Sequence, residues 1–226
     1  AFFLQGLRET ATALASKHIP LVLLQGHPDE EIAGFLHTHK ASLLVTDFTP
    51  LRPTRQWLDQ ILEGTSLPVH EVDAHNIVPA RLVSDKQEYA ARTFRPKVQR
   101  LLPEFLVPFP ELRQHPFPLP DFQNSDFPAA LASLPEDPEA GPISLKPGSD
   151  AGLARLAVFL RDGLPRYATQ RNDPNAEANS GLSPYLHFGQ ISAQRVALEV
   201  LQQPADENSE SFLEELIVRR ELSDNF

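Results

Sequence analysis

The sequence of 226 residues contains no cysteine and no methionine, and it has a single tryptophan, Trp57. Without cysteine the chain can form neither a disulfide framework nor a thiolate metal site, and the redox compartment cannot be read from it. No apolar run approaches the length of a membrane span, and the opening AFFLQGLRE lacks the basic flank and cleavage site of a signal peptide. We therefore expect a soluble intracellular protein, in the cytoplasm or the nucleus.

The missing methionine and the first residues indicate a piece of a longer protein. The chain opens directly on the amphipathic pattern AFFLQGLRETATALA, with no strand before it. We therefore interpret the sequence as an internal fragment. Its hydrophobic content of 41% is enough to bury a core, and its length favours one or two domains.

Positive charge is scarce, since the formal net charge is -10. Phosphate contacts are supplied mainly by Lys and Arg, so this value argues at first sight against a nucleic-acid surface. The distribution weakens that argument, because residues 1–100 carry 11 basic and 11 acidic side chains and the acidic excess lies in residues 101–226. A basic groove would nevertheless need residues that this chain lacks.

Apolar runs alternate with helical patterns over residues 1–100. Short strands are indicated by three apolar runs: IPLVLLQG at 19–26, SLLVTDF at 42–48 and LPVHEVDA at 67–74. Helices are indicated before and between them, at 3–14, 28–41 and 49–65. This alternation predicts an α/β domain with a doubly wound parallel sheet, whose first strand would lie upstream of Ala1.

Composition changes near residue 101, where a proline-rich segment begins. Residues 101–150 hold 11 of the 22 prolines, which predicts an interdomain connector with little regular helix. Its phenylalanines predict that it lies along protein surface: Phe105, Phe109, Phe117, Phe122 and Phe127. Residues 151–226 then show helical periodicity without a strand pattern, which predicts an all-helical second domain.

The stretch NSGLSPYLHFGQIS at 179–192 is rich in helix-start signals. Ser183 precedes Pro184, and Ser192 precedes AQRVALEV, so both serines are predicted N-caps. Two capped helices would explain the stretch without any function. Alternatively, hydroxyls and free N–H groups at a helix start suit a diphosphate, and the residues that would supply them are Asn179, Ser180, Gly181, Leu182 and Ser183. No GxGxxG or GxxxxGK[ST] pattern accompanies them.

Two further clusters of polar residues allow both a structural and a functional interpretation. In EELIVRRELSDNF at 214–226, the simplest interpretation is an amphipathic helix with an i, i+4 pair of Glu215 and Arg219. Asp73, His75 and Asn76 at a strand end could touch a ligand, and a turn held by Asx hydrogen bonds is at least as well supported. The eight histidines form no HExxH or paired-ligand spacing, so no metal site is expected.

Three separated segments resemble the class II cyclobutane pyrimidine dimer photolyases: EVDAHNIVPARLVSDKQEYAARTFRPKV at 71–98, NSGLSPYLHFGQISAQR at 179–195 and EELIVRRELSDNF. The resemblance implies that residues 151–226 begin a helical FAD-binding domain. It also implies that Tyr167 and residues 179–183 contact FAD, that Glu215 lies at the lesion pocket, and that Arg219 has a phosphate or ion-pair role. Class I relatives place a Trp where this chain has Val218, so stacking on the lesion from that position is lost.

The function that this resemblance implies is light-driven repair of cyclobutane pyrimidine dimers in DNA, by electron transfer from excited reduced FAD. It also implies a monomer, flipping of the dimer out of the duplex, and an antenna chromophore of unidentified type. Two alternatives stay open. One is a cryptochrome-like flavin photoreceptor without repair activity, and the other is a flavin-free α/β interaction module.

Overall fold

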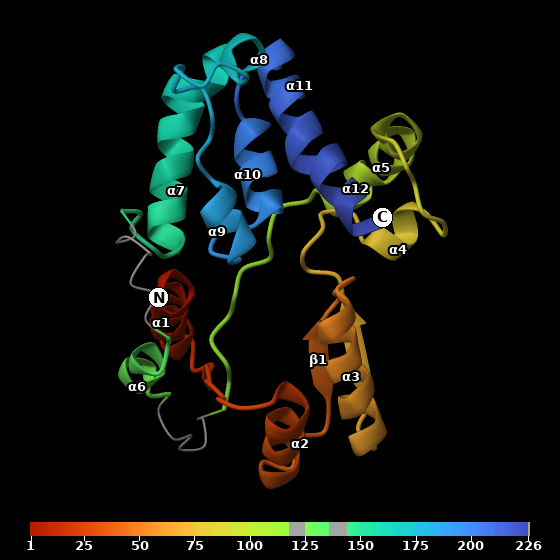
Figure 1. Ribbon diagram of the computed structural model, residues 1–226, viewed down its shortest axis with the longest axis vertical. Coiled ribbons are helices and arrows are strands. Elements are labelled where there is room, and N and C mark those ends of the chain that lie inside the picture. The colour runs from red at the N-terminus through yellow and green to blue at the C-terminus, as the bar shows by residue number, and fades with distance from the viewer. Residues whose placement is uncertain (118–124, 136–143, 226) are drawn as a thin grey trace. The chain divides into compact units, whose positions relative to one another are not determined.

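The computed structural model describes residues 1–117, 125–135 and 144–225, and the chain forms two compact units (Figure 1). One unit combines Ala1–Leu23 with Pro108–Leu213, and the other combines Leu24–Val107 with Glu214–Phe226. This grouping follows packing and differs from the predicted domain boundaries at residues 100 and 150, which stay predictions. Each unit is described by itself.

The unit containing Leu24–Val107 is built around two parallel strands. β1 (Leu44–Asp47) pairs with β2 (Val69–Val72) in a register that sets Leu44 opposite Val69. Parallel neighbours need a crossover, and α3 (Arg52–Gly64) supplies it while packing against α2 (Pro28–Thr38). Three acidic residues in the first turn of α2 complement its dipole: Asp29, Glu30 and Glu31. The predicted α/β class with parallel strands is confirmed.

The strand expected over residues 19–26 is wrong. These residues have no strand conformation, and their backbone bonds to a side chain far along the sequence. The N–H of Leu23 donates to Ser125 Oγ at 2.7 Å, and the Ser125 hydroxyl donates to the carbonyl of Leu21 at 3.0 Å. A strand is defined by pairing with another strand, and the apolar pattern of this run does not encode a partner.

The same unit continues through a loop after β2 into two helices, α4 (Ala80–Val83) and α5 (Ala91–Phe105). Asp73 orders the loop, because its carboxylate accepts hydrogen bonds from the N–H groups of Asn76 at 3.0 Å and Ala80 at 2.8 Å. The Asx turn that was one of the two interpretations of this segment is therefore present. The unit also includes η3 (Glu214–Arg219), which is a π-helical segment, and α12 (Arg220–Asn225).

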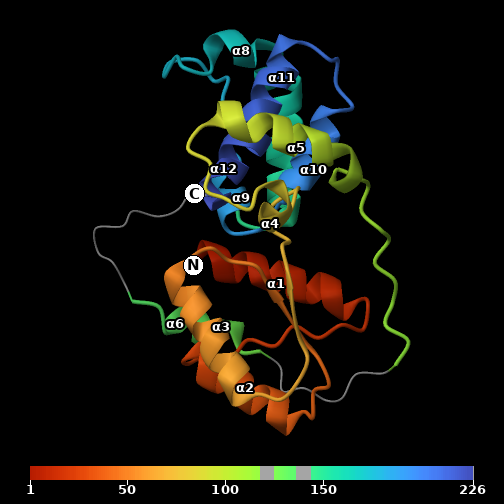
Figure 2. The ribbon, with the colours of Figure 1, turned by 90° about the vertical axis from the view of Figure 1, so that its right-hand side faces the viewer.

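In the unit containing Pro108–Leu213, all regular elements of the described residues are helices, as predicted for 151 onward. Its longer helices are α1 (Phe2–Ala15), α7 (Ser149–Val158), α10 (Ala193–Val200) and α11 (Glu207–Leu213). Shorter ones are α6 (Phe127–Ala132), α8 (Tyr167–Gln170) and α9 (Ser183–His187). α1 packs against α6 and α7, and α10 packs against α11 (Figures 1 and 2).

Gln190 is the polar centre of this helical core. Its side chain is 7% exposed; its Nε2 donates to the carbonyl of Phe2 at 3.2 Å, and its Oε1 accepts from the N–H of Gly148 at 2.7 Å. Gly6 on α1 leaves room for it, because a Cβ at Gly6 would lie 2.5 Å from Gln190 Nε2. One side chain therefore ties α1 to the residue that precedes α7.

Part of the proline-rich segment packs on the helical unit, but Phe117 is 69% exposed, so the prediction that the phenylalanines lie along protein surface holds only in part. The Arg195 guanidinium lies 4.9 Å from the ring centroid of Phe109, and the N–H of His115 donates to the carbonyl of Lys17 at 2.8 Å. Phe127 is buried in α6, where Asp126 caps the helix by accepting from the N–H of Ala129. Phe122 lies outside the described residues.

Candidate functional site

Tyr167 is held in a fixed orientation by aromatic packing. After α7 the helix widens into a π turn, η1 (Phe159–Gly163), and narrows into a 3-10 turn, η2 (Leu164–Arg166), which carries the chain into α8. The ring of Tyr167 meets Phe159 and Phe212 edge-on, with centroids 5.9 Å and 5.2 Å apart, and is 7% exposed. The Arg171 guanidinium lies 5.7 Å from its centroid. The predicted site residue is thus a rigid part of the helical core.

Residues 179–183 form an ordered turn because Arg155 holds its backbone. Arg155 Nε donates to the carbonyl of Ser180 at 2.6 Å, and a terminal nitrogen donates to the carbonyl of Asn179 at 3.1 Å. Gly181 follows with a φ of +65°, which only glycine adopts without strain. Leu182 is fully buried and anchors the turn, whereas Asn179, Gly181 and Ser183 are exposed.

The turn and Tyr167 belong to one continuous network in the helical unit. Asn179 Nδ2 donates to the carbonyl of Arg171 at 3.3 Å, and the same Arg171 covers the Tyr167 ring. The structure therefore brings together Tyr167 and residues 179–183, which are twelve or more positions apart in the sequence.

The helix-cap prediction is right for one serine and wrong for the other. Ser192 caps α10, and its hydroxyl accepts from the N–H of Arg195 at 3.1 Å. Ser183 is the first residue of α9, Leu182 occupies the cap position, and no side chain caps the helix. Burial of Leu182 fixes the entry of the chain into α9 and sets Ser183 one position too late to cap. The exposed Ser183 hydroxyl is consequently not used as a cap.

Glu215 and Arg219 lie on η3, in the unit with the parallel strands. Leu216, Ile217 and Val218 are buried there, while Glu215 is half-buried and Arg219 is exposed. The sequence pointed to an ion pair between Glu215 and Arg219, which stays a prediction. The neighbouring Glu214 accepts a two-pronged contact from Arg95, at 2.9 Å and 2.6 Å, and lies 3.7 Å from Arg219 Nε. These Arg contacts hold the pKa of Glu214 below its ordinary value, Arg95 contributing most.

A buried carboxyl, Glu221 on α12, was not singled out from the sequence. It is 1% exposed and accepts from the N–H of Ile77 at 2.7 Å and of Val78 at 3.4 Å. Burial raises the pKa of Glu221 from its ordinary 4.5 to about 7, and Asp73 adds to this effect; the two N–H bonds and the nearby Arg220 oppose it. Next to Glu221, Arg220 donates to the carbonyl of His75 at 3.2 Å. Glu221 fastens α12 to the loop after β2.

Sequence reasoning also missed Arg155, and it assigned Arg171 to an ion pair with Asp173 without foreseeing its place over the Tyr167 ring. Arg155 stands 24 and 25 residues before the carbonyls that it binds, so no local spacing connects them. Gly181 after Asn179 and Ser180 was the accessible signal, because Asn, Ser and Gly in succession mark a turn. Arg171 was visible as a charge near Tyr167, but its stacking depends on the turn of η2.

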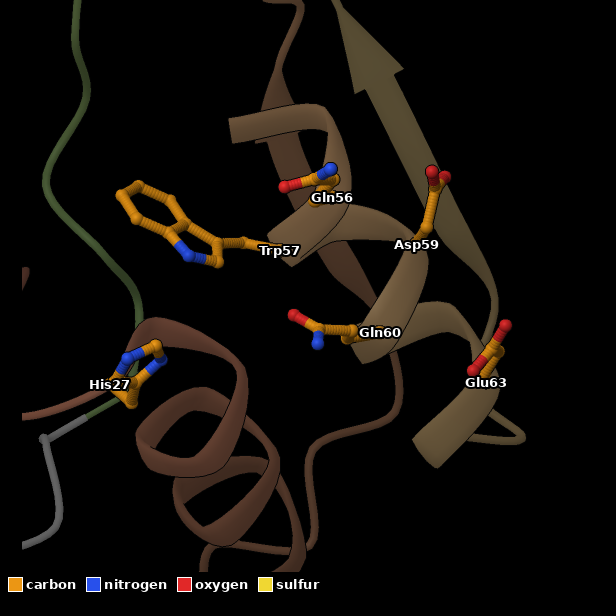
Figure 3. A pocket seen from close by; sticks show the side chains of 6 residues that line it. All are labelled: His27, Gln56, Trp57, Asp59, Gln60 and Glu63. Atoms are coloured by element: carbon orange, nitrogen blue, oxygen red, sulfur yellow. The ribbon is translucent and has the colours of Figure 1, made fainter. Parts of the chain in front are cut away.

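A pocket, here called the Trp57 pocket, lies beside α3 in the unit with the parallel strands. Its cavity of about 460 Å³ is open and is lined by His27, Gln56, Trp57, Asp59, Gln60 and Glu63. Trp57 and His27 lie on one side of it, whereas Asp59 and Glu63 project to the other side of α3 (Figure 3). His27 is bonded to Asp29, which raises the pKa of the imidazole. The pocket contains none of the predicted site residues.

A metal site and a membrane-spanning helix were both sought in the part of the chain that the structure describes, and neither is present there. Within it, no three His, Cys, Asp or Glu side chains come close enough to hold a metal ion. Among the same residues, no helix combines the length and the apolar character required to cross a membrane.

Comparison with known proteins agrees with the helical and α/β units described above. The sequence model of the DNA photolyase family matches residues 1–117, and the chain belongs to this family. Relatives named deoxyribodipyrimidine photo-lyase are 46% identical in Arabidopsis thaliana, 43% in Oryza sativa and 41% in Potorous tridactylus, each over the whole chain. The chain spans about half the length of these curated relatives, between 43% and 48%.

Solved structures show the same fold at low sequence identity. A cryptochrome from Synechocystis matches 99% of the chain and 49% of its own length, with a TM-score of 0.80 and 18% identity. A class III photolyase from Agrobacterium tumefaciens matches 99% of the chain and 48% of its own length, with a TM-score of 0.73 and 20% identity. These likenesses establish the photolyase and cryptochrome fold.

Proposed function

We propose that the natural protein that carries this chain is a class II photolyase that repairs cyclobutane pyrimidine dimers in DNA as a monomer, using FAD and light. The observation that carries the proposal is the whole-chain similarity to plant and marsupial deoxyribodipyrimidine photo-lyases. The resemblance of the segments at 71–98, 179–195 and 214–226 to class II photolyases supports the assignment to class II.

In this proposal Tyr167 and residues 179–183 hold FAD, and their chemistry fits that group. Ser180 and Ser183 offer hydroxyls, Asn179 offers an amide, and the glycine at 181 keeps the turn free of a side chain. Oxygen anions are bound well by such donors. Reduced FAD, when bound and excited by light, supplies the electron that splits the dimer, and the residues of the chain hold it and exclude water.

Glu215 is proposed to meet the dimer, and Arg219 is proposed to contact the DNA phosphates. The exposed guanidinium of Arg219 projects from η3 while its apolar neighbours are buried, so it can reach a phosphate without unpacking the segment. Glu215 is half-buried on the same segment, where its side chain can form a hydrogen bond to the pyrimidine dimer whose ring is being split.

The test is dimer repair by the purified natural protein on an oligonucleotide with one thymine dimer. We expect restoration of intact thymines that requires both illumination with near-UV or blue light and prior reduction of the protein. Bound FAD without any repair would contradict the proposal and favour the cryptochrome-like photoreceptor. A protein that retains no flavin at all would favour the flavin-free module.

A further inference from the structure

We propose that Arg155 is a positioning residue for the turn of residues 179–183. This role rests on the proposed function of that turn, which is to hold the phosphates of FAD. Arg155 lies on α7, outside all three segments that carry the family resemblance. Its guanidinium holds two consecutive backbone carbonyls of the turn, and through them it aims backbone N–H groups at the place of the phosphates.

The argument starts from the geometry of the peptide plane. In a trans peptide the C=O of one residue and the N–H of the next point in opposite directions. Arg155 binds the carbonyl of Ser180 at 2.6 Å and that of Asn179 at 3.1 Å. The N–H groups of Ser180 and Gly181 therefore point away from the guanidinium. Two successive N–H groups turned to one side suit an oxygen anion.

Gly181 provides a second, independent constraint on the same arrangement. Its φ of +65° is strained for any residue with a side chain, and a Cβ would lie 2.8 Å from Arg155 Nε. The guanidinium has little freedom to retreat, because its two hydrogen bonds fix its plane. The turn therefore needs arginine at 155 and glycine at 181 together.

Arginine is required here for its shape rather than for its charge alone. The guanidinium presents its donors in a planar fork, which matches two neighbouring carbonyls, whereas the ammonium of lysine is a single point donor. Arg155→Lys keeps the positive charge and gives up one of the two carbonyl bonds. A positioning role therefore predicts that Lys does not rescue function, and a purely electrostatic role predicts that it does.

The experiment compares FAD and riboflavin affinity in the natural protein for wild type, Arg155→Lys, Arg155→Gln and Arg166→Lys. Riboflavin lacks the phosphates, so it reports the rest of the flavin site. Arg166→Lys is a matched control, because Arg166 also donates to two backbone carbonyls, those of Asp162 at 2.9 Å and Glu177 at 3.2 Å, but not to residues 179–180. Thermal melting of the flavin-free protein monitors folding.

We expect FAD affinity to fall roughly tenfold or more in both Arg155 variants. Riboflavin affinity should stay within about twofold of wild type, and the melting temperature should stay within a few degrees of wild type. Arg166→Lys should bind FAD like wild type. Wild-type FAD affinity in Arg155→Lys overturns the positioning role, and so does an equal loss of FAD and riboflavin binding, which indicates general damage. If wild type itself binds no FAD, the proposed function fails, whatever the Arg155 variants do.

Discussion

At the scale of single residues, the exposed hydroxyl of Ser183 separates flavin binding from helix stability. Ser183 is exposed and caps no helix, so Ser183→Ala should leave the folded protein as stable as wild type. If the hydroxyl bonds a charged phosphate, its loss should weaken FAD binding by about 1.5 to 3 kcal/mol. Equilibrium titration of the flavin-free natural protein with FAD measures this change.

Ser192→Ala is the matched control, because the Ser192 hydroxyl does cap α10. Removing it should lower the free energy of unfolding by about 1 kcal/mol and leave FAD affinity unchanged. If Ser183→Ala binds FAD as tightly as wild type does, the Ser183 hydroxyl does not contribute to FAD binding.

The proposed role of Glu215 can be tested by comparing Glu215→Ala, which removes the polar group, with Glu215→Gln, which keeps a polar group of similar size. An electron transferred to the dimer gives it negative charge before the ring splits, and a nearby hydrogen-bond donor stabilises that charge. Glu215→Ala should lower the repair yield per absorbed photon about tenfold, the equivalent of one bond worth about 1.4 kcal/mol. Glu215→Gln keeps a donor and should retain most of the yield, and FAD content should be normal in both variants.

The readout is repair quantum yield on a thymine-dimer oligonucleotide with pre-reduced protein, together with dimer affinity. Equal yield and affinity in wild type and Glu215→Ala would show that Glu215 has only a structural role on η3.

Glu221 makes stability depend on pH in an unusual direction. Its pKa of about 7 in the fold exceeds its ordinary 4.5, so the folded chain keeps a proton that the unfolded chain releases over this interval. The stability that this proton provides is complete below pH 4.5 and is lost as pH rises through about 7. One unit of pKa difference corresponds to about 1.4 kcal/mol, so the full loss should be on the order of 3 kcal/mol.

Glu221→Gln removes this titration, so the free energy of unfolding of wild type relative to the variant should fall between pH 5 and pH 7.5. Urea unfolding at both pH values measures it, and Glu63→Gln, at an exposed position of the same unit, is the control. A difference that stays constant with pH would show that Glu221 does not carry the raised pKa.

At the scale of elements, Gln190 joins α1 to the start of α7. Gln190→Leu would leave the N–H of Gly148 and the carbonyl of Phe2 without their partner in the core. A buried group that loses its partner costs about 1 to 3 kcal/mol, so the free energy of unfolding should fall by that amount. Gln202→Leu, at an exposed position after α10, should change stability by less than about 0.5 kcal/mol in the same denaturation experiment.

Sequence patterns predicted elements best where local signals decide the structure. The cap at Ser192, the Asx turn at Asp73 and the helices after residue 151 depend on neighbours within a few positions. The expected strand at 19–26 failed because its backbone bonds to Ser125, about a hundred residues away. Arg155 was missed for the same reason, since its partners lie on a distant turn.

At the scale of the whole molecule, family membership and fold agree, and the activity of the natural protein is what remains to be tested. The chain belongs to the DNA photolyase family and matches photolyase and cryptochrome structures over 99% of its length. Because members of this fold include proteins named for repair and proteins named cryptochromes, fold alone does not select between repair and light sensing. The proposal of repair rests on the class II segments and on the relatives named deoxyribodipyrimidine photo-lyase that match the whole chain.

The most direct measurement is therefore light-dependent reversal of a thymine dimer by the reduced natural protein, followed by chromatography of the oligonucleotide products. The proposal predicts that the dimer-free strand accumulates in proportion to absorbed near-UV or blue light, and that none forms in the dark. A flavin-loaded, reduced protein that leaves the dimer intact after prolonged illumination would contradict the proposal.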